Sequence, residues 1–299
     1  MNSSTIETVR TSNPVLPLER EVSEREARKV AEAAREKEWK LPSFVRELFL
    51  GRLRMDLINP LPEPKQDDGE RGEDFLRRLE DYLRTVDGDE LDRVPGMPAE
   101  VHDALSELGA FGMKIPQEFG GLGFSQRTYT RALALCGTHS STISVTLSAH
   151  QSIGVPQPLV LFGTDEQKEK YLPRLAKGAI SGFALTETDV GSDPARMQCE
   201  AVLSDDGCTY VLNGSKLWCT NAPLAELLVV MARVPGEEGG PGGITAFIVD
   251  MATEGVEVTN RCSFMGLPGI ENGVVQFKNC LLYTSDAADE RSSVDLGGR

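Results

Sequence analysis

The spacing of apolar residues along the first part of the chain predicts helices. Apolar residues recur three and four positions apart in FLRRLEDYLRTV and PAEVHDALSELGAFG, as on one face of a helix. The same spacing at Leu41–Arg54 predicts an amphipathic helix that must pack against something. RTYTRALALCGTHSSTISVTLSAHQS is expected to be one long, mostly uncharged helix at the buried centre of a bundle. Thr164, with Gln167 three residues later, predicts a capping box at the start of a further helix.

After Gly182 the pattern changes to short runs that are typical of strands. CEAVLSDDGCTYVLNGSKLWCTNA alternates and contains Asp-Gly and Asn-Gly, the strongest short hairpin signals. The runs LLVVMARV, GITAFIVDM, GVEVTN and GVVQFKN follow between glycine turns. Helices followed by strands, without alternation, argue against a parallel doubly wound sheet. The expected fold is therefore α+β: an all-α N-terminal domain at 41–182, followed by a small antiparallel β-domain at 183–279.

The first forty residues form a polar arm. Residues 1–20 lack periodicity and are expected to be disordered, whereas the Ala-, Glu-, Lys- and Arg-rich stretch Ser23–Lys40 favours helix. Pro60, Pro62 and Pro64 predict a linker before the next helix.

Composition excludes several classes of protein. With 299 residues, 31 Lys plus Arg and 46 Asp plus Glu, the chain has a net charge of −15, which repels phosphate backbones and argues against nucleic-acid binding. No apolar run reaches the ~18–20 residues that a bilayer crossing needs, and the N-terminus lacks a secretory signal. A cytoplasmic protein is expected, with association at a membrane surface left open. The six cysteines lack C-x-x-C spacing and the three histidines lie apart, so reduced, mostly buried thiols and no metal site are expected.

The stretch FALTETDVGSDPAR, Phe183–Arg196, combines hydroxyls, carboxylates and backbone N–H groups at the end of a predicted strand. These groups suit a flat heteroaromatic ligand with polar edges. They also suit an ordinary turn. The stretch alone leaves both interpretations open.

The order of motifs resembles the acyl-CoA dehydrogenase family. The LTETDVGSD junction lies between the helical and β segments, NGSKLWCTNAPLA lies within the β segment, and the resemblance covers roughly Leu41–Asn279. It is closest to the very-long-chain branch, on FVRELFLGRL, ELGAFG, GGLG, AHQSIG, LFGTDEQKEKYLP and NGSKLW. The resemblance implies FAD in the groove between the two domains and an acyl-CoA substrate. It also implies an electron-transfer flavoprotein or similar acceptor, and a homodimer or homotetramer at full length.

The resemblance also assigns roles to residues. Leu185 and Thr186 would border the pyrimidine edge of the flavin, and Ser192 would contact acyl-CoA as well. In the second segment Trp218 would lie beside the isoalloxazine and Thr220 would donate to N5. The expected cofactor-binding set is Phe183, Ala184, Leu185, Thr186, Gly191, Ser192, Trp218, Cys219 and Thr220.

Each assignment has a structural alternative. Trp218 could be a core residue, Thr186 and Thr220 could be ordinary strand threonines, and Ser192 could cap a turn. Lys216 is expected to be a solvated strand residue.

The implied reaction is α,β-dehydrogenation of an acyl-CoA, with a long chain suggested by the branch. A carboxylate base removes the α-proton while hydride leaves the β-carbon for flavin N5. No catalytic residue is assigned, because the family's base glutamate lies in a C-terminal helical domain, and Glu187 is not a candidate. The chain itself is expected to be inactive and to have little affinity for flavin. The alternative is a flavin-binding relative without this activity, such as an assembly factor or a nitroalkane-oxidase-like flavoprotein.

The final stretch, CLLYTSDAADERSSVDLGGR, departs from the family pattern. Its back-translation matches the transposon-end adapter used in sequencing libraries. Cys280–Arg299 are therefore expected to be a non-native adapter translation.

Overall fold

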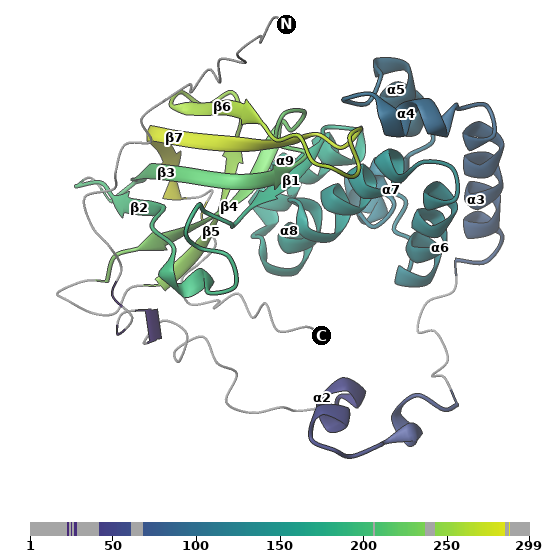
Figure 1. Cartoon of the computed structure of the whole chain (residues 1–299), viewed down its shortest axis with the longest axis horizontal. Helices are drawn as coiled ribbons and strands as arrows, with labels where there is room; N and C mark the ends of the chain where they lie inside the picture. The colour runs from purple at the N-terminus through teal and green to yellow at the C-terminus, as the bar shows by residue number, and fades with distance from the viewer. Residues whose placement is uncertain are drawn as a thin grey trace, which may run out of the picture.

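A helical region leads into a curled seven-stranded sheet, which confirms the predicted order of the two domains (Figure 1). The computed structural model describes residues 23, 25, 27–28, 42–60, 68–205, 207–236, 243–284 and 287. The helices are α2 (Phe44–Phe49), α3 (Gly69–Leu83), α4 (Gly88–Arg93), α5 (Ala99–Glu107), α6 (Gln126–Gly137), α7 (Ser141–Ser148), α8 (Pro156–Phe162) and α9 (Asp165–Ala176). The strands are β1 (Ser181–Ala184), β2 (Glu200–Leu203), β3 (Thr209–Thr220), β4 (Leu227–Val234), β5 (Gly243–Asp250), β6 (Val256–Arg261) and β7 (Asn272–Tyr283).

Some of the sequence expectations lie outside the described residues. They are the disorder of residues 1–20, most of the helix expected at 23–40, residues 61–67 of the proline linker, and the end of the chain beyond residue 287. β7 extends to Tyr283 and buries the side chain of Cys280. The adapter origin of Cys280–Arg299 stays a prediction.

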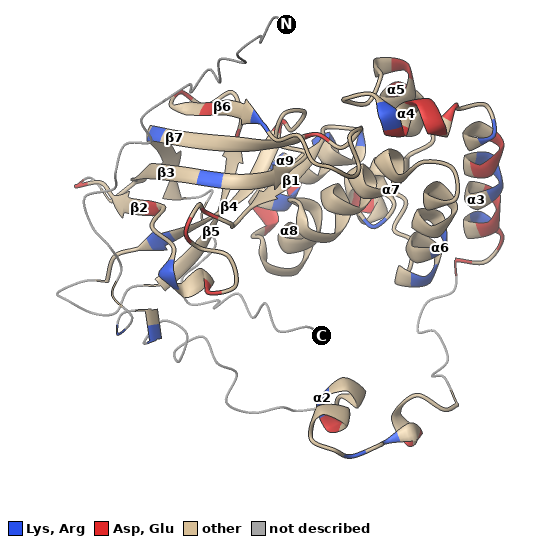
Figure 2. Cartoon of the chain, viewed as in Figure 1, with Lys and Arg blue, Asp and Glu red and all other residues tan. Residues whose placement is uncertain are grey.

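The helical region packs by the periodicity that predicted it. On α3, Phe75, Leu76, Leu79 and Leu83 share one buried face, while charged side chains cover the other (Figure 2). The capping box on α9 is also confirmed: Thr164 Oγ1 accepts from Gln167 N, and the Gln167 side chain accepts from Thr164 N. No helix in the described ranges has both the length and the apolar composition that crossing a membrane requires.

The single long helix expected at the centre of the bundle is wrong. Two α-helices are present, α6 and α7, with a break at residues 138–140, and a short π-helix (Ala149–Ile153) follows α7. The Ser140 hydroxyl accepts from Ile143 N, and the Asp92 carboxylate of α4 accepts from Ser141 N and Thr142 N, both at 2.9 Å. These acceptors satisfy the free N–H groups of a new helix start, which an uninterrupted helix would not offer.

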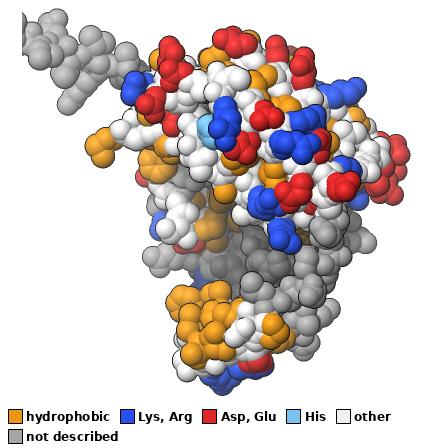
Figure 3. Space-filling model, turned by 90° about the vertical axis from the view of Figure 1, so that its right-hand side faces the viewer, with side chains coloured by type: hydrophobic (Ala, Val, Ile, Leu, Met, Phe, Trp, Pro, Cys, Tyr) orange, Lys and Arg blue, Asp and Glu red, His pale blue; other side chains and the backbone are white. Residues whose placement is uncertain are grey.

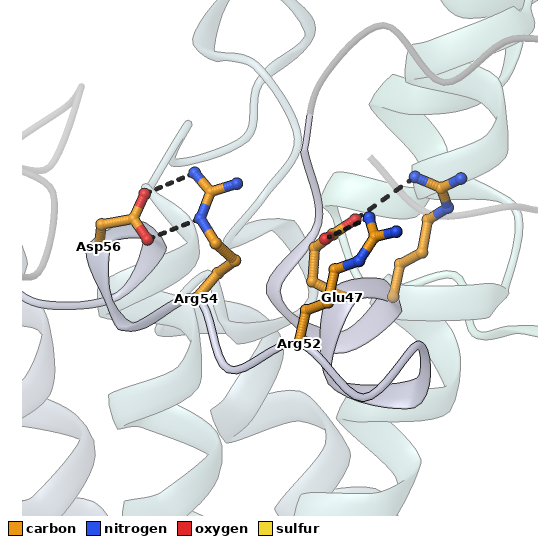
Figure 4. A network of polar contacts seen from close by, with 5 residues as sticks. Glu47, Arg52, Arg54 and Asp56 are labelled. Carbon is orange, nitrogen blue, oxygen red and sulfur yellow. Dashed lines mark hydrogen bonds and ion pairs between the residues drawn. The ribbon is translucent and has the colours of Figure 1, made fainter.

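The amphipathic helix expected at Leu41–Arg54 is shorter than predicted, and its apolar side chains are largely exposed. α2 ends at Phe49, and Gly51 follows with φ +75°, a left-handed conformation that stops the helix. Phe49 is 88% exposed, and Val45, Leu48, Leu50 and Leu53 are also exposed. Figure 3 shows hydrophobic side chains gathered at the lower end of the molecule, where Figure 1 places α2. Local ion pairs join Arg52 to Glu47 at 3.4 Å and Arg54 to Asp56 at 2.6 Å (Figure 4).

The sheet is mixed rather than wholly antiparallel. β2–β3, β3–β7, β4–β5 and β6–β7 pair antiparallel as predicted, but β1 pairs with β4 in parallel, and β2 shares one parallel pair with β4. The parallel pairs arise because the chain leaves β1, forms the β2–β3 hairpin, and then returns to the side of β1 as β4. Such a crossover cannot be deduced from alternation alone.

One of the two predicted turns is also wrong. The Asp-Gly signal does fall between β2 and β3, where Gly207 has φ +67°. The Asn213-Gly214 pair instead lies inside β3, at a shift in the register with β7. Gly214 has φ +145°, and a Cβ there would lie 2.7 Å from the Cα of Cys199. The glycine therefore allows a close approach of two strands rather than a turn.

Buried polar side chains join the helical region to the sheet. Asn221 Nδ2 donates to Thr146 O on α7 at 3.0 Å and to Ser181 O on β1 at 3.1 Å. His150 accepts from Ser181 N at Nδ1, so its proton resides on Nε2, which donates to Phe111 O at 3.0 Å. Burial lowers the pKa of His150 to about 4, so the imidazole is neutral at physiological pH.

Candidate functional site

A bulge near the end of β3 exposes one of the predicted site residues. Lys216 pairs with Val275 and Cys219 with Gly273, so Leu217 and Trp218 together oppose the single residue Val274. Trp218 has φ +58°, and its side chain is 58% exposed. The alternative that Trp218 is a core residue does not fit this exposure.

The bulge also brings the two predicted segments together. Leu217 N donates to Thr186 O at 2.8 Å, and Lys216 Nζ donates to Leu185 O at 3.0 Å. The segment after β1 is therefore attached to the bulge of β3 through its backbone carbonyls. The two stretches that sequence reasoning assigned to one ligand lie side by side.

Lys216 is buried, so the expectation of a solvated lysine is wrong. It has no solvent exposure, and its Nζ lies 2.7 Å from Glu187 Oε1. Glu187 also accepts from Gln198 N at 2.6 Å and Cys199 N at 3.0 Å. The position is buried because it faces inward in the strand alternation, and the carboxylate neutralises its charge there. With three N–H donors, Glu187 is engaged in structure and is not a free base.

Thr220 lies opposite Asn272 across the β3–β7 pair. Asn272 Nδ2 donates to Thr220 Oγ1 at 3.0 Å and to Trp218 O at 3.2 Å. On its other side Thr220 meets Gly182 of β1, where an added Cβ would lie 2.5 Å from Thr220 O. Only glycine at position 182 permits this close approach of the two backbones, so Thr220 lies between β1 and β7.

The remaining predicted residues differ in how they could reach a ligand. Ala184 and Cys219 point into the core, so only their backbone groups are available, and burial raises the pKa of the Cys219 thiol to about 12. Phe183 is half-buried on β1. Gly191 and Ser192 lie on an exposed turn beyond the Glu187–Val190 bridge.

The chemistry of this edge fits a flat ring with polar sides. It combines an exposed indole, two threonine hydroxyls and the backbone around Leu185 and Thr186. The six cysteines, all within the described ranges, form no disulfide with one another, and no group of three His, Cys, Asp or Glu side chains in those ranges could hold a metal ion.

Sequence reasoning missed three residues of this arrangement: Lys216, Asn221 and Asn272. Asn221 has φ +68°, a conformation that asparagine tolerates, and its position directly after Thr220 was an available signal. Asn272 had no signal in the sequence, because its role depends on the register between β3 and β7.

Family models match both parts of the chain. The N-terminal domain of acyl-CoA dehydrogenases matches residues 73–179, and the middle domain of acyl-CoA dehydrogenases matches residues 182–280. The boundary between the two matches falls directly before the second residue of β1.

Curated relatives are similar over most of the chain. It is 54% identical over 256 residues to the probable acyl-CoA dehydrogenase FadE10 of Mycobacterium tuberculosis, covering 86% of this chain and 39% of that protein. It is 40% identical over 227 residues to the rat very long-chain specific acyl-CoA dehydrogenase, covering 72% of this chain and 34% of that protein. The chain therefore spans less than two fifths of the length of these relatives.

Solved structures share the fold. Butyryl-CoA dehydrogenase from Megasphaera elsdenii matches with a TM-score of 0.68 at 30% identity, over 77% of this chain and 60% of that one. An acyl-CoA dehydrogenase from Bacillus anthracis in complex with FAD matches with a TM-score of 0.63 at 28% identity, over 76% of this chain and 39% of that one.

Proposed function

The chain belongs to the acyl-CoA dehydrogenase family, and we propose that it is the flavin-facing part of an FAD-dependent enzyme that dehydrogenates acyl-CoA thioesters. The observation that supports this most directly is the bulge of β3, which holds the segment of Leu185 and Thr186 beside Trp218 and Thr220. A long acyl chain is supported by the similarity to a very long-chain specific relative.

In this proposal the two segments bind and orient FAD. The backbone at Leu185 and Thr186 borders the pyrimidine edge, Thr220 donates a hydrogen bond, and the indole of Trp218 covers the ring. Ser192, on its exposed turn, contacts acyl-CoA. Bound FAD would supply the hydride acceptor. These residues hold the ring in place and keep water from it.

Proton abstraction is assigned to a carboxylate outside these two segments. Glu187 is buried, pairs with Lys216 and accepts two backbone N–H groups. Loss of a general base costs roughly 10²–10⁴-fold in rate, so the chain as given is expected to have no measurable dehydrogenase activity. The electron-transfer flavoprotein, the homo-oligomeric state and the cytoplasmic location expected from the sequence stay predictions.

The test is a hybrid enzyme. Residues 41–279 replace the matching part of Mycobacterium tuberculosis FadE10, and the rest of the hybrid comes from that relative. The hybrid is expected to bind FAD and, with a long-chain acyl-CoA, to reduce an artificial electron acceptor and release the 2-enoyl-CoA. The chain as given, assayed alongside, is expected to be inactive.

The outcomes separate the proposal from its alternative. A folded hybrid that binds no FAD would contradict the cofactor assignment. A hybrid that binds FAD but leaves every acyl-CoA unoxidised, while parental FadE10 oxidises one, would favour a flavin-binding relative without this activity. Acyl-CoA turnover by the chain as given would show that it contains a base.

A further inference from the structure

The side-chain amide of Asn272 has a defined orientation. Its nitrogen lies 3.2 Å from the carbonyl oxygen of Trp218, which can only accept, so this atom must be the nitrogen rather than the oxygen of the amide. The second hydrogen of the same nitrogen is directed at Thr220 Oγ1, 3.0 Å away. Both hydrogens of the amide group are thereby used.

This arrangement fixes the role of the Thr220 hydroxyl. A hydroxyl has one hydrogen to donate and two lone pairs that accept. Because Asn272 donates to Thr220 Oγ1, the hydroxyl hydrogen cannot point along the same line and stays available to another acceptor. Thr220 is thus set as a donor.

Stability alone does not explain a buried asparagine here. Asn272 is 4% exposed, and its Oδ1 is buried without a hydrogen-bond partner in the described part of the chain. A buried acceptor without a partner destabilises the folded state, so an apolar residue would suit the fold better. The amide nitrogen is the atom of this side chain that makes hydrogen bonds, to Trp218 O and to Thr220 Oγ1.

We propose that Asn272 is a positioning residue for the ligand of the β3 bulge: it holds the hydroxyl of Thr220 as a hydrogen-bond donor toward the flavin and fixes the backbone of Trp218. The inference rests on the proposed function for the identity of the ligand. The hydrogen-bond network itself stands on the geometry of this chain.

The first experiment measures the network without a cofactor. In the ¹⁵N-labelled full chain, both side-chain amide hydrogens of Asn272 are expected to exchange slowly with water. Thr220→Val should accelerate the exchange of one of them, whereas Thr220→Ser, which keeps a hydroxyl, should not. Two rapidly exchanging hydrogens in the unsubstituted chain, or no effect of Thr220→Val, would overturn the inference.

The second experiment measures the effect on the flavin in the hybrid enzyme. Asn272→Asp has nearly the same shape but, as a carboxylate, can only accept, so the Thr220 hydroxyl would turn toward it. Asn272→Leu removes the donor in any protonation state and serves as a second variant. Each is expected to weaken FAD binding about threefold to tenfold, as for the loss of one hydrogen bond, and to shift the flavin absorption bands and midpoint potential.

A double-substitution cycle separates positioning from a general structural role. In a Thr220→Val background, the changes at Asn272 are expected to shift the flavin bands and the potential less than in the parent, because only the contact with Trp218 O remains to be lost. Shifts of equal size in both backgrounds, or none in either, would overturn the inference while leaving the proposed function intact. A hybrid that binds no FAD defeats the proposed function, and the ligand-directed part of the inference with it.

Discussion

A fully buried lysine is stable only where its charge is paired and its ammonium hydrogens find acceptors. Lys216 finds a carboxylate in Glu187 and a carbonyl in Leu185, and Glu187 in turn accepts two backbone N–H groups at the start of the next strand. The pair thus holds the segment after β1 on the buried side of β3, whereas the indole of Trp218 is on the exposed side. Breaking one half of it leaves the other half as an uncompensated buried charge.

We expect Lys216→Met to destabilise the chain by about 3–5 kcal/mol, since it leaves the Glu187 carboxylate buried without a cation. The measurement is urea unfolding followed by circular dichroism. The control is Lys216→Met combined with Glu187→Gln, which removes both charges and should recover part of the loss. A single variant as stable as the parent would show that the pair contributes nothing.

Thr220→Val keeps the β-branched shape of the side chain and removes its hydroxyl. In the hybrid enzyme it is expected to weaken FAD binding by about threefold to tenfold and to change the rate of flavin reduction by acyl-CoA. Thr220→Ser is the matched control. An unchanged spectrum and reduction rate in Thr220→Val would mean that Thr220 is only a strand residue.

At the scale of elements, helix starts are set by side chains that can lie far away in sequence. α7 begins with its own Ser140 cap, but Asp92 on α4 supplies two further acceptors. Burial alone would raise the pKa of Asp92, yet hydrogen bonds from Thr142, Ser140 and Ser141 outweigh it and lower the pKa to about 2. The carboxylate is therefore stabilised in its charged form by the start of α7.

A carboxyl group whose pKa is lower in the folded state than in the unfolded state stabilises the fold at pH values above its unfolded pKa. This stabilisation is lost as pH falls through the folded pKa. Asp92 should contribute up to about 2 kcal/mol above pH ~3.8, and this contribution should vanish as pH falls toward about 2. Asp92→Asn should lose it at neutral pH and show a flatter stability profile over that range. Parallel profiles for both proteins in acid unfolding would contradict this account.

The contrast between α9 and α7 shows what sequence can predict. Thr164 and Gln167 are three residues apart, so their capping box follows from the sequence. The cap that Asp92 adds to α7 depends on tertiary structure. Because the sequence pattern does not show this cap, the uncharged stretch was predicted as one long helix. The same limit applies to Asn213-Gly214, because a glycine in a strand gives no sign of which neighbour approaches it.

The candidate site was predicted only in part, for a related reason. The segments around Leu185 and Trp218 could be found from motif resemblance. The alternation of a strand could not show that Lys216 is buried, because a polar letter in that pattern normally faces solvent. Asn272 and Glu187 acquire their roles through register and a long-range ion pair, which no local pattern encodes.

For the whole molecule, the contact between the two domains depends on a neutral histidine. His150 joins the backbone of Phe111 in the helical region to Ser181 at the start of β1. Protonation would place a second hydrogen on Nδ1, where the Ser181 N–H already points, and would bury a charge. The charge of His102 lowers the pKa of His150 further.

A histidine whose pKa is lowered on folding stabilises the protein above its unfolded pKa, and the stabilisation is lost as pH falls toward the folded value. The free energy of unfolding should therefore drop by about 3 kcal/mol between pH 6.5 and about 4 because of His150. His150→Gln should lack this component, so the stability difference between the two proteins should shrink over that range. A constant difference would show that His150 does not titrate as described.

The bulge of β3 has a consequence for insertions and deletions. Lys216 and Cys219 are both buried although they are three positions apart, because one extra residue restores the inward phase of the strand. A gene that lost the codon of Trp218 would still encode a strand of regular phase, with the pairs to Val275 and Gly273 in place. The sheet would keep its register but lose its exposed indole. A single in-frame deletion would therefore give a protein that still folds but lacks the side chain assigned to cover the ligand.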